Sequence, residues 1–142
     1  MFKLGKRSRK RLEGVHPSLI KLIEFSLNHK DCPYDFGIPQ LGGLRTVEDQ
    51  KRLYAGGRTI PGKIVTYVDG VKKKSNHQAK EDGFGHAFDI YGLDHGVATW
   101  SPSILTPIAE HIKNCAKELN IEIEWGGDWT KFKDLPHFQL KS

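Results

Sequence analysis

Four residues of this chain have side chains of the types found in hydrolytic metal sites. His77 and Asp89 belong to the stretch "SNHQAKEDGFGHAFD", in which a polar loop runs into an apolar segment. Asp134 and His137 belong to "WGGDWTKFKDLPHFQL". Two imidazoles and a carboxylate are ligands that zinc accepts in hydrolytic sites, where a fourth position stays open for water. His77, Asp89 and His137 are therefore candidate metal ligands.

The same three residues also have ordinary structural interpretations. Seven histidines in 142 residues give many chance triples, and the chain has no HExxH motif. His77 would then be a surface loop residue, Asp89 a cap or ion-pair partner, and His137 a partly buried imidazole. A carboxylate that enters a core is costly unless it is paired or bound to a metal, so Asp89 needs a partner in either interpretation.

Asp134 is a candidate general base. On a straight strand, residues three apart point to opposite faces, which would separate Asp134 from His137. Pro136 biases Leu135 toward an extended conformation and cannot donate to a ladder, so the strand should begin near this point. A turn there would carry the Asp134 carboxylate toward the attacking water, where a base is needed. The alternative is an exposed turn residue.

The elements around these residues predict a small α+β domain. Apolar spacing and capping residues predict helices within residues 15–30, from Thr46 to Gly56, and from Ser101 to Asn120. Strands are expected in "YDFGIPQ", "AFDIYG", "IEIEW" and "HFQL", and a hairpin in "IVTYVDGVKKK" that turns at Asp69-Gly70. We expect a short antiparallel sheet packed against two to three helices, with the candidate zinc site at the sheet edge.

Length and composition limit the classes of protein. The 142 residues, 37% apolar and 27% charged, suit a single domain over residues 1–142. The sequence has no run of 18 apolar residues, so no membrane span is predicted, and the N-terminus lacks the apolar region of a signal peptide. We therefore expect synthesis in a cytoplasm, with Cys32 and Cys115 as free thiols.

Residues 1–14 form a basic N-terminal segment, and the net charge of the chain is +5. Such a run is usually a solvated face or a frayed tail, and its functional interpretation is attraction to an anionic wall or membrane surface. Phe2 is its only aromatic residue, so the stacking residues of single-strand binding are absent and no specific nucleic-acid partner is expected. The cations of the segment are Lys3, Lys6, Arg7, Arg9, Lys10 and Arg11.

In their order along the chain, these motifs resemble the LAS zinc peptidases, which include VanX- and VanY-like enzymes and phage endolysins that cleave L-Ala–D-Glu bonds. The pattern of that family has Ser-x-His, a glycine, Ala-x-Asp, and a late His with Glu or Asp three residues before it. "GGLRT" is similar to its Gly-x-Arg-Thr element, and "EDQKRLYAGGRT" and "WGGDW" are similar to further family segments. The matching residues here are Arg45, Ser75, His77, Gly85, Ala87, Asp89, Asp134 and His137.

One departure from the family pattern concerns the first histidine. The family spaces its His and Asp seven residues apart, whereas His77 and Asp89 are twelve apart because "AKEDG" forms extra loop. A rival alignment uses His86, three residues before Asp89. The Ser-x-His context favours His77 and leaves His86 as a substrate-binding or outer group.

The resemblance implies roles for individual residues. His77, Asp89 and His137 would be zinc ligands and Asp134 the general base. Arg45 would stabilise the carbonyl oxygen as it gains charge. Weaker candidates for substrate binding or for orienting a ligand are Ser75, His86 and Asp128.

The resemblance also implies a function: a monomeric, zinc-dependent peptidoglycan endopeptidase of the phage endolysin type, acting on the L-Ala–D-Glu bond of the stem peptide. Such an enzyme would wait in the host cytoplasm until the inner membrane is permeabilised. One alternative is a D-Ala–D-Ala carboxypeptidase or dipeptidase of the same family. Another is a non-catalytic zinc-binding wall module, which the presence of Asp134 and Arg45 counts against. Only the charge favours a DNA-binding protein.

Overall fold

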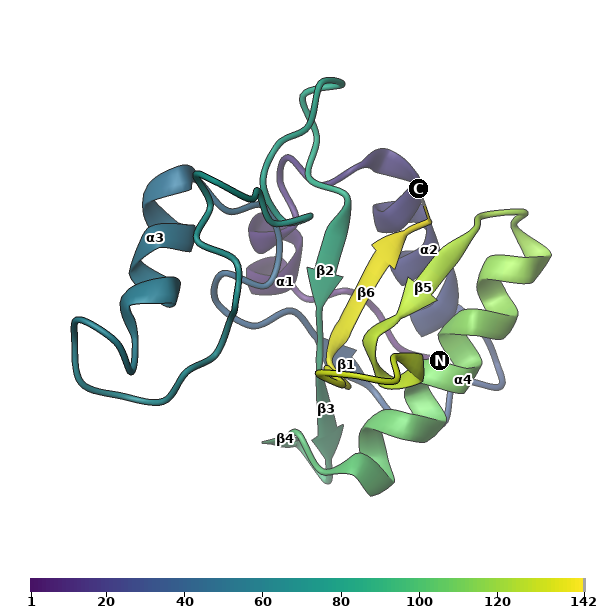
Figure 1. Cartoon of the computed structure of the whole chain (residues 1–142). Coiled ribbons are helices and arrows are strands. Elements are labelled where there is room, and N and C mark those ends of the chain that lie inside the picture. Colours follow the sequence, from purple (N-terminus) through teal and green to yellow (C-terminus); the bar gives the residue numbers. More distant parts are fainter. Residues whose placement is uncertain (142) are drawn as a thin grey trace.

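The structure, a computed structural model that describes residues 1–141, has the α+β architecture expected from the sequence (Figure 1). No helix in this part of the chain has the length and apolar character needed to cross a membrane. Its helices are α1 (Lys6–Arg11), α2 (Pro17–Asn28), α3 (Val47–Ala55) and α4 (Pro102–Glu118), with a 3-10 turn η1 (Gly126–Asp128). Its strands are β1 (Phe36–Gly37), β2 (Ala87–Asp89), β3 (Tyr91–Asp94), β4 (Val97–Thr99), β5 (Ile123–Trp125) and β6 (His137–Leu140).

The strands form two antiparallel sheets of three strands each, in the orders β1-β3-β4 and β2-β6-β5. Ile90 alone separates β2 from β3, so one stretch of chain contributes to both sheets. Figure 1 shows α4 on the β5 side of the molecule and α3 on the opposite side, beyond β2. The helices α2 and α4 pack together, and α4 also contacts β3 and β5. The core thus lies between this helix pair and the sheets.

The sheet β2-β6-β5 has one apolar and one polar face, because successive residues of a strand point to opposite sides. Phe88, Phe138 and Trp125 lie side by side in register and are buried in the core. The neighbouring pair Asp89 and His137 points the other way. Alternation of apolar and polar residues in three short strands therefore places the candidate ligands on the face away from the core.

The helices begin and end where the sequence indicates. Pro17 stands at the start of α2 and the His16 side chain accepts the N–H of Ser18. Thr46 and Asp49 form a complete capping box at the start of α3. Two residues after α4, Asn120 adopts a left-handed conformation with φ 57°, which reverses the chain toward β5.

The predicted hairpin in residues 64–74 is wrong, because the structure has no strand there. The carboxylate of Asp69 instead accepts the backbone N–H groups of Val71, Lys72 and Lys73 at 2.9–3.1 Å. Aspartate side chains compete with a ladder in this way, since they offer the backbone a local acceptor. The segment is therefore a loop, and its Val68 carbonyl is held by the side chain of Gln50.

The basic N-terminal segment is a packed helix and not a frayed tail. Leu4, Ser8 and Leu12, spaced four residues apart, are buried, and Ser8 Oγ accepts the N–H of Ile38. The four-residue spacing of these buried residues is hard to recognise in the sequence, because most of the residues around them are cations. The packing fixes α1 against the domain and leaves its charged residues on the outer face.

We predict that Phe138→Ala destabilises the protein by roughly 3–5 kcal/mol, because Phe138 is fully buried and stacks on Phe88 with ring centroids 5.1 Å apart. Phe132→Ala is the matched control: Phe132 is 70% exposed, so we expect a loss of about 1 kcal/mol or less. Urea denaturation followed by far-UV circular dichroism measures both. Equal losses would contradict the assignment of Phe138 to the core.

Candidate metal centre

Three donor atoms converge at the end of β2 and the start of β6. His77 Nε2 lies 3.2 Å from His137 Nδ1 and 3.4 Å from Asp89 Oδ1, and the last two atoms are 3.2 Å apart. His77 is 2% exposed and His137 is 7% exposed. Antiparallel pairing of Asp89 with His137 supplies two corners of this triangle, and the loop before β2 supplies the third.

The outer nitrogen of each imidazole faces an oxygen. His77 Nδ1 lies 2.9 Å from the Gly43 carbonyl, which can only accept, so Nδ1 of a neutral His77 carries the hydrogen. His137 Nε2 lies 2.7 Å from Gln139 Oε1. When both imidazoles are neutral and hydrogen-bonded in this way, the nitrogens that face Asp89 carry lone pairs.

The third donor is oriented by Arg45. Its guanidinium donates to Asp89 Oδ2 at 3.0 Å, which leaves Oδ1 directed at the two imidazoles. Burial alone would raise the pKa of Asp89, but the charges and hydrogen bonds of His77 and His137 outweigh it, so the pKa is lowered. The carboxylate therefore stays ionised.

The two histidines differ in their affinity for protons. Burial lowers the pKa of His77. Burial would also lower the pKa of His137, but the hydrogen bond and charge of Asp89 outweigh it and raise that pKa. Protons and a metal ion thus compete for His137 Nδ1.

This arrangement fits a tetrahedral metal ion. Zinc binds nitrogen at about 2.0–2.1 Å, which places two ligands of a tetrahedron about 3.3 Å apart. The three donors here are 3.2–3.4 Å apart, and two nitrogens with one carboxylate oxygen match the ligand chemistry of catalytic zinc sites. The cluster is thus able to hold a metal ion with one position left for water.

The extra loop between His77 and Asp89 closes on itself. Lys80 N–H donates to the Phe84 carbonyl and Gly83 N–H to the Lys80 carbonyl, and Ala79 bridges Gly85. A Cβ at Gly85 would lie 2.9 Å from the His77 carbonyl oxygen, so the return of the chain requires glycine. The extra loop therefore increases the number of residues between His77 and Asp89 but does not separate the two residues in space.

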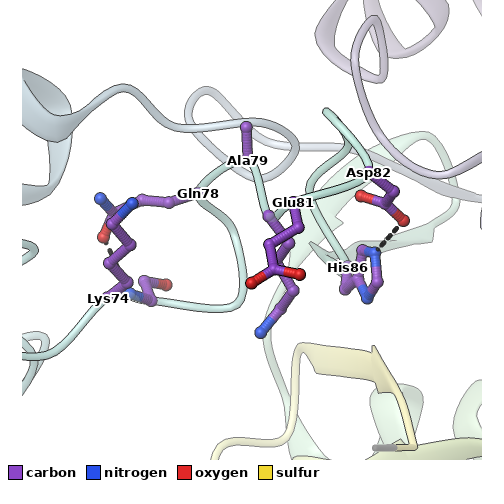
Figure 2. Close-up of a pocket in the computed structure, with 8 residues that line it drawn as sticks. Lys74, Gln78, Ala79, Glu81, Asp82 and His86 are labelled. Carbon is purple, nitrogen blue, oxygen red and sulfur yellow. Dashed lines mark hydrogen bonds and ion pairs between the residues drawn. The ribbon is translucent and has the colours of Figure 1, made fainter.

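His86 belongs to the outer side of this loop. Its Nε2 lies 2.6 Å from Asp82 Oδ2, and Figure 2 shows the pair across a hollow from Lys74 and Gln78. Its ring also packs against His16 in a T-shaped arrangement, with centroids 5.4 Å apart. His86 is not in the three-donor cluster, and its role in substrate binding stays a prediction.

Asp134 lies in a turn before β6, as expected from Pro136. The N–H of His137 donates to the Asp134 carbonyl, and the N–H of Asp134 donates to the Gly126 carbonyl. A Cβ at Gly126 would clash with the backbone of Asp134, so this close approach also requires glycine. Loss of solvation raises the pKa of the Asp134 carboxyl, and Asp89 raises it further, whereas His137, His77 and Arg45 lower it. Asp134 is nevertheless exposed, as its interpretation as a turn residue predicts, and its role as a general base stays a prediction.

Arg45 has more contacts than the sequence predicts. Besides Asp89, its guanidinium donates to the Leu41 carbonyl at 2.8 Å and to Gln50 Oε1 at 3.2 Å. Burial lowers its pKa, and nearby carboxylates oppose that shift, Asp89 first. The contact with Asp89 makes Arg45 part of the site, whereas its role toward a carbonyl oxygen stays a prediction.

The other candidates differ in their contacts with the cluster. Ser75 Oγ accepts the N–H of His77 at 3.1 Å and so fixes the backbone of a candidate ligand. Asp128 pairs with Lys113 of α4 at 2.8 Å, and no hydrogen bond within residues 1–141 joins it to the three donors. Trp129 lies against His137, with ring centroids 5.2 Å apart.

Comparison with known proteins identifies the relatives of this site. The family model described as phage L-alanyl-D-glutamate peptidase matches residues 1–139. The chain belongs to the phage L-alanyl-D-glutamate peptidase family. The resemblance in the sequence motifs is thereby confirmed, and the twelve-residue spacing of His77 and Asp89 occurs within a member of this peptidase family.

Two proteins illustrate the relationship. The chain is 32% identical to the peptidoglycan L-alanyl-D-glutamate endopeptidase CwlK of Bacillus subtilis strain 168 over 106 residues, which is 69% of this chain and 57% of that protein. The chain thus spans less than two thirds of the length of that relative. Its fold is similar to the crystal structure of the Serratia marcescens L-Ala D-Glu endopeptidase ChiX, with a TM-score of 0.73 and 28% identity over 99% of this chain and 90% of the other.

Three polar groups of this peptidase-family site are not predicted from the sequence motifs. The Gly43 carbonyl holds His77, Gln50 links Arg45 to the loop after α3, and Gln139 holds His137. The position of Gln139 beside His137 could have been predicted, because residues two apart on a strand share a face. No sequence signal indicates that the carbonyl of Gly43 is the one that His77 meets.

We predict that the protein binds one divalent metal ion per chain, that His77→Ala loses it and that His86→Ala keeps it. His77 provides a corner of the triangle, whereas His86 is bonded to Asp82 outside it. Elemental analysis after dialysis against equimolar metal measures the occupancy. Loss of metal in His86→Ala together with retention in His77→Ala would show that the alignment across the loop is wrong.

Proposed function

We propose that the protein is a zinc-dependent peptidoglycan endopeptidase that hydrolyses the L-Ala–D-Glu bond of stem peptides. The observation that carries this proposal is the triangle of His77 Nε2, Asp89 Oδ1 and His137 Nδ1, whose atoms lie 3.2–3.4 Å from one another. Membership of the peptidase family and similarity to CwlK and ChiX support the choice of bond.

His77, Asp89 and His137 would hold the zinc ion. When bound, zinc polarises a carbonyl group and lowers the pKa of water toward about 7. The other steps belong to residues of this chain. Asp134 accepts a proton as the water oxygen attacks the carbonyl carbon, and returns a proton to the amine nitrogen as the carbon–nitrogen bond breaks.

Arg45 has two tasks in this mechanism. Its bond to Asp89 Oδ2 holds Oδ1 toward the metal position. Three of its N–H groups are committed to Leu41, Gln50 and Asp89, and a guanidinium has five donors in all. The remaining N–H groups stabilise negative charge that develops on the carbonyl oxygen of the substrate.

In biological terms, we propose that the protein is a phage endolysin. It is made in the host cytoplasm, acts as a monomer and reaches the peptidoglycan once the inner membrane is permeabilised. The word phage in the description of its family supports this role.

We predict that the zinc-loaded protein releases fragments with a new N-terminal D-Glu from purified peptidoglycan, and that Asp134→Asn slows this release by roughly 10²–10⁴-fold while it keeps the metal. Mass spectrometry of the soluble muropeptides identifies the bond, and elemental analysis checks the metal. Asparagine has a similar shape to aspartate but cannot accept the proton.

The fragments also distinguish the alternatives. Release of D-Ala alone from the stem peptide would favour a carboxypeptidase, and hydrolysis of the free D-Ala–D-Ala dipeptide to D-Ala would favour a dipeptidase. Metal binding with no product from several peptidoglycan types would favour a non-catalytic wall module. An unchanged rate in Asp134→Asn would remove this residue from the mechanism.

The outer face of α1 is proposed as a surface that holds the enzyme near an anionic wall or membrane. Arg9 is paired with Glu24 and Arg11 donates to the Ile38 carbonyl, so these two cations are engaged within the protein. The remaining four are exposed, three of them on the packed helix α1 and one shortly before it. They are Lys3, Lys6, Arg7 and Lys10.

We predict that changing these four residues to Gln reduces cosedimentation with purified cell walls at low salt and leaves hydrolysis of a soluble stem peptide unchanged. The attraction acts through the field, so it should weaken as salt shortens the Debye length from about 10 Å at 0.1 M to about 3 Å at 1 M. A matched control changes four exposed lysines on α3 and its following loop to Gln, which are Lys51, Lys63, Lys72 and Lys73. Equal losses in both variants would mean that net charge, and not the α1 surface, determines binding.

A further inference from the structure

Three polar side chains of the sheet β2-β6-β5 extend from the proposed metal centre in a line. His137 and Gln139 are two residues apart on β6 and share a face, and Glu124 is the direct neighbour of Gln139 on β5. His137 Nε2 lies 2.7 Å from Gln139 Oε1, and Gln139 Nε2 donates to Glu124 Oε2 at 3.0 Å. Asn76, next to His77, also donates to Gln139 Oε1 at 2.9 Å.

Glu124 determines which way the Gln139 amide points. An ionised carboxylate only accepts hydrogen bonds, so it must face the NH₂ group of Gln139. The reversed amide would place two oxygens against each other at this contact. The carbonyl oxygen Oε1 is therefore directed at His137, where it too can only accept.

The direction of the amide in turn determines the tautomer of His137. Because Oε1 accepts, Nε2 of the neutral ring carries the hydrogen and Nδ1 keeps the lone pair that faces Asp89 and His77. With the amide reversed, its NH₂ group would donate to Nε2, and the hydrogen of the ring would move to Nδ1. A hydrogen on Nδ1 would occupy the direction in which a metal ion must bind.

We infer that Glu124 and Gln139 are positioning residues that hold His137 in its metal-binding tautomer, with Glu124 acting through Gln139. The inference rests on the proposed metal centre. His77 needs no such device, because a backbone carbonyl, which cannot be reversed, faces its Nδ1. The same sheet that buries Phe138 thus also sets the hydrogen position on His137.

The experiment compares zinc affinity by chelator competition in the full chain, in three test variants and in one control variant. Glu124→Gln and Gln139→Leu should bind zinc roughly 10–100-fold more weakly, the range typical of groups that hold metal ligands. The exchange Glu124→Gln with Gln139→Glu restores an acceptor at His137 and a donor beside it, so it should recover most of the lost affinity. Glu122→Gln is the control, because Glu122 is exposed and its side chain makes no hydrogen bond within residues 1–141, where its backbone carbonyl accepts the N–H of Lys141.

A second measurement follows the tautomer directly. Long-range ¹⁵N–¹H NMR spectra of the zinc-free protein at mildly alkaline pH distinguish a hydrogen on Nε2 from one on Nδ1. We expect the Nε2–H form of His137 in the parent and in the exchanged variant, and an increased Nδ1–H form in Glu124→Gln. His77 is an internal reference, because the Gly43 carbonyl should keep its hydrogen on Nδ1 in every variant.

The outcomes separate this inference from the proposed function. Parent-like zinc affinity and tautomer in Glu124→Gln would overturn the inference and leave the metal centre intact. An exchanged variant that folds but binds zinc as weakly as Glu124→Gln would also overturn it. A parent protein that binds no zinc would overturn both. If Gln139→Leu does not fold, Glu124→Gln and the exchanged variant decide the question.

Discussion

The structure holds three acceptor atoms, two of them on buried histidines, close together against their mutual repulsion. When both imidazoles are neutral, their lone pairs and an ionised carboxylate oxygen face each other at 3.2–3.4 Å. Such a cluster is unfavourable unless a proton or a cation lies among the atoms, and low exposure increases the cost. The pKa of His137 is raised for the same reason, because a proton on its ring is attracted by Asp89. Much of the surrounding chain serves to hold these atoms in place.

The two sides of the site are held in different ways. On one side, the backbone holds His77, through the Gly43 carbonyl and the bond between Arg45 N–H and the His77 carbonyl. On the other side, side chains hold the ligands, with Arg45 on Asp89 and Gln139 on His137. The register of β2 with β6 joins the two ligands, and the stacked pair of Phe88 and Phe138 fixes that register from the core side. A slip of one residue would turn Asp89 and His137 into the core. The packing of the apolar face therefore determines where the residues of the polar face lie.

Sequence reasoning recovered the features that depend on local periodicity and capping. These include α2, α3, α4, the alternating strands β5 and β6, and the turn before His137. The hairpin in residues 64–74 failed, because the side chain of Asp69 satisfies N–H groups that a ladder would need. The packing of α1 was hidden because Leu4 and Leu12 are isolated among cations. For the candidate site, the family resemblance selected the ligands, but the partner of Arg45 could not be predicted, since Asp89 lies 44 residues away.

The number of residues between two ligands determines the geometry of the site less than the contacts that hold each ligand. His77 is fixed by contacts outside the extra loop between His77 and Asp89, and Asp89 by the strand pairing that follows this loop. Because Ala79 and Gly85 bridge the base of the loop, its length does not enter the geometry of the triangle. The cost of a longer closed loop rises only with the logarithm of its length, about 0.6 kcal/mol for each doubling. A loop of this kind can therefore vary in length and in charge while the three donor atoms stay in place. The hollow lined by Lys74 and His86 in Figure 2 would vary with the loop.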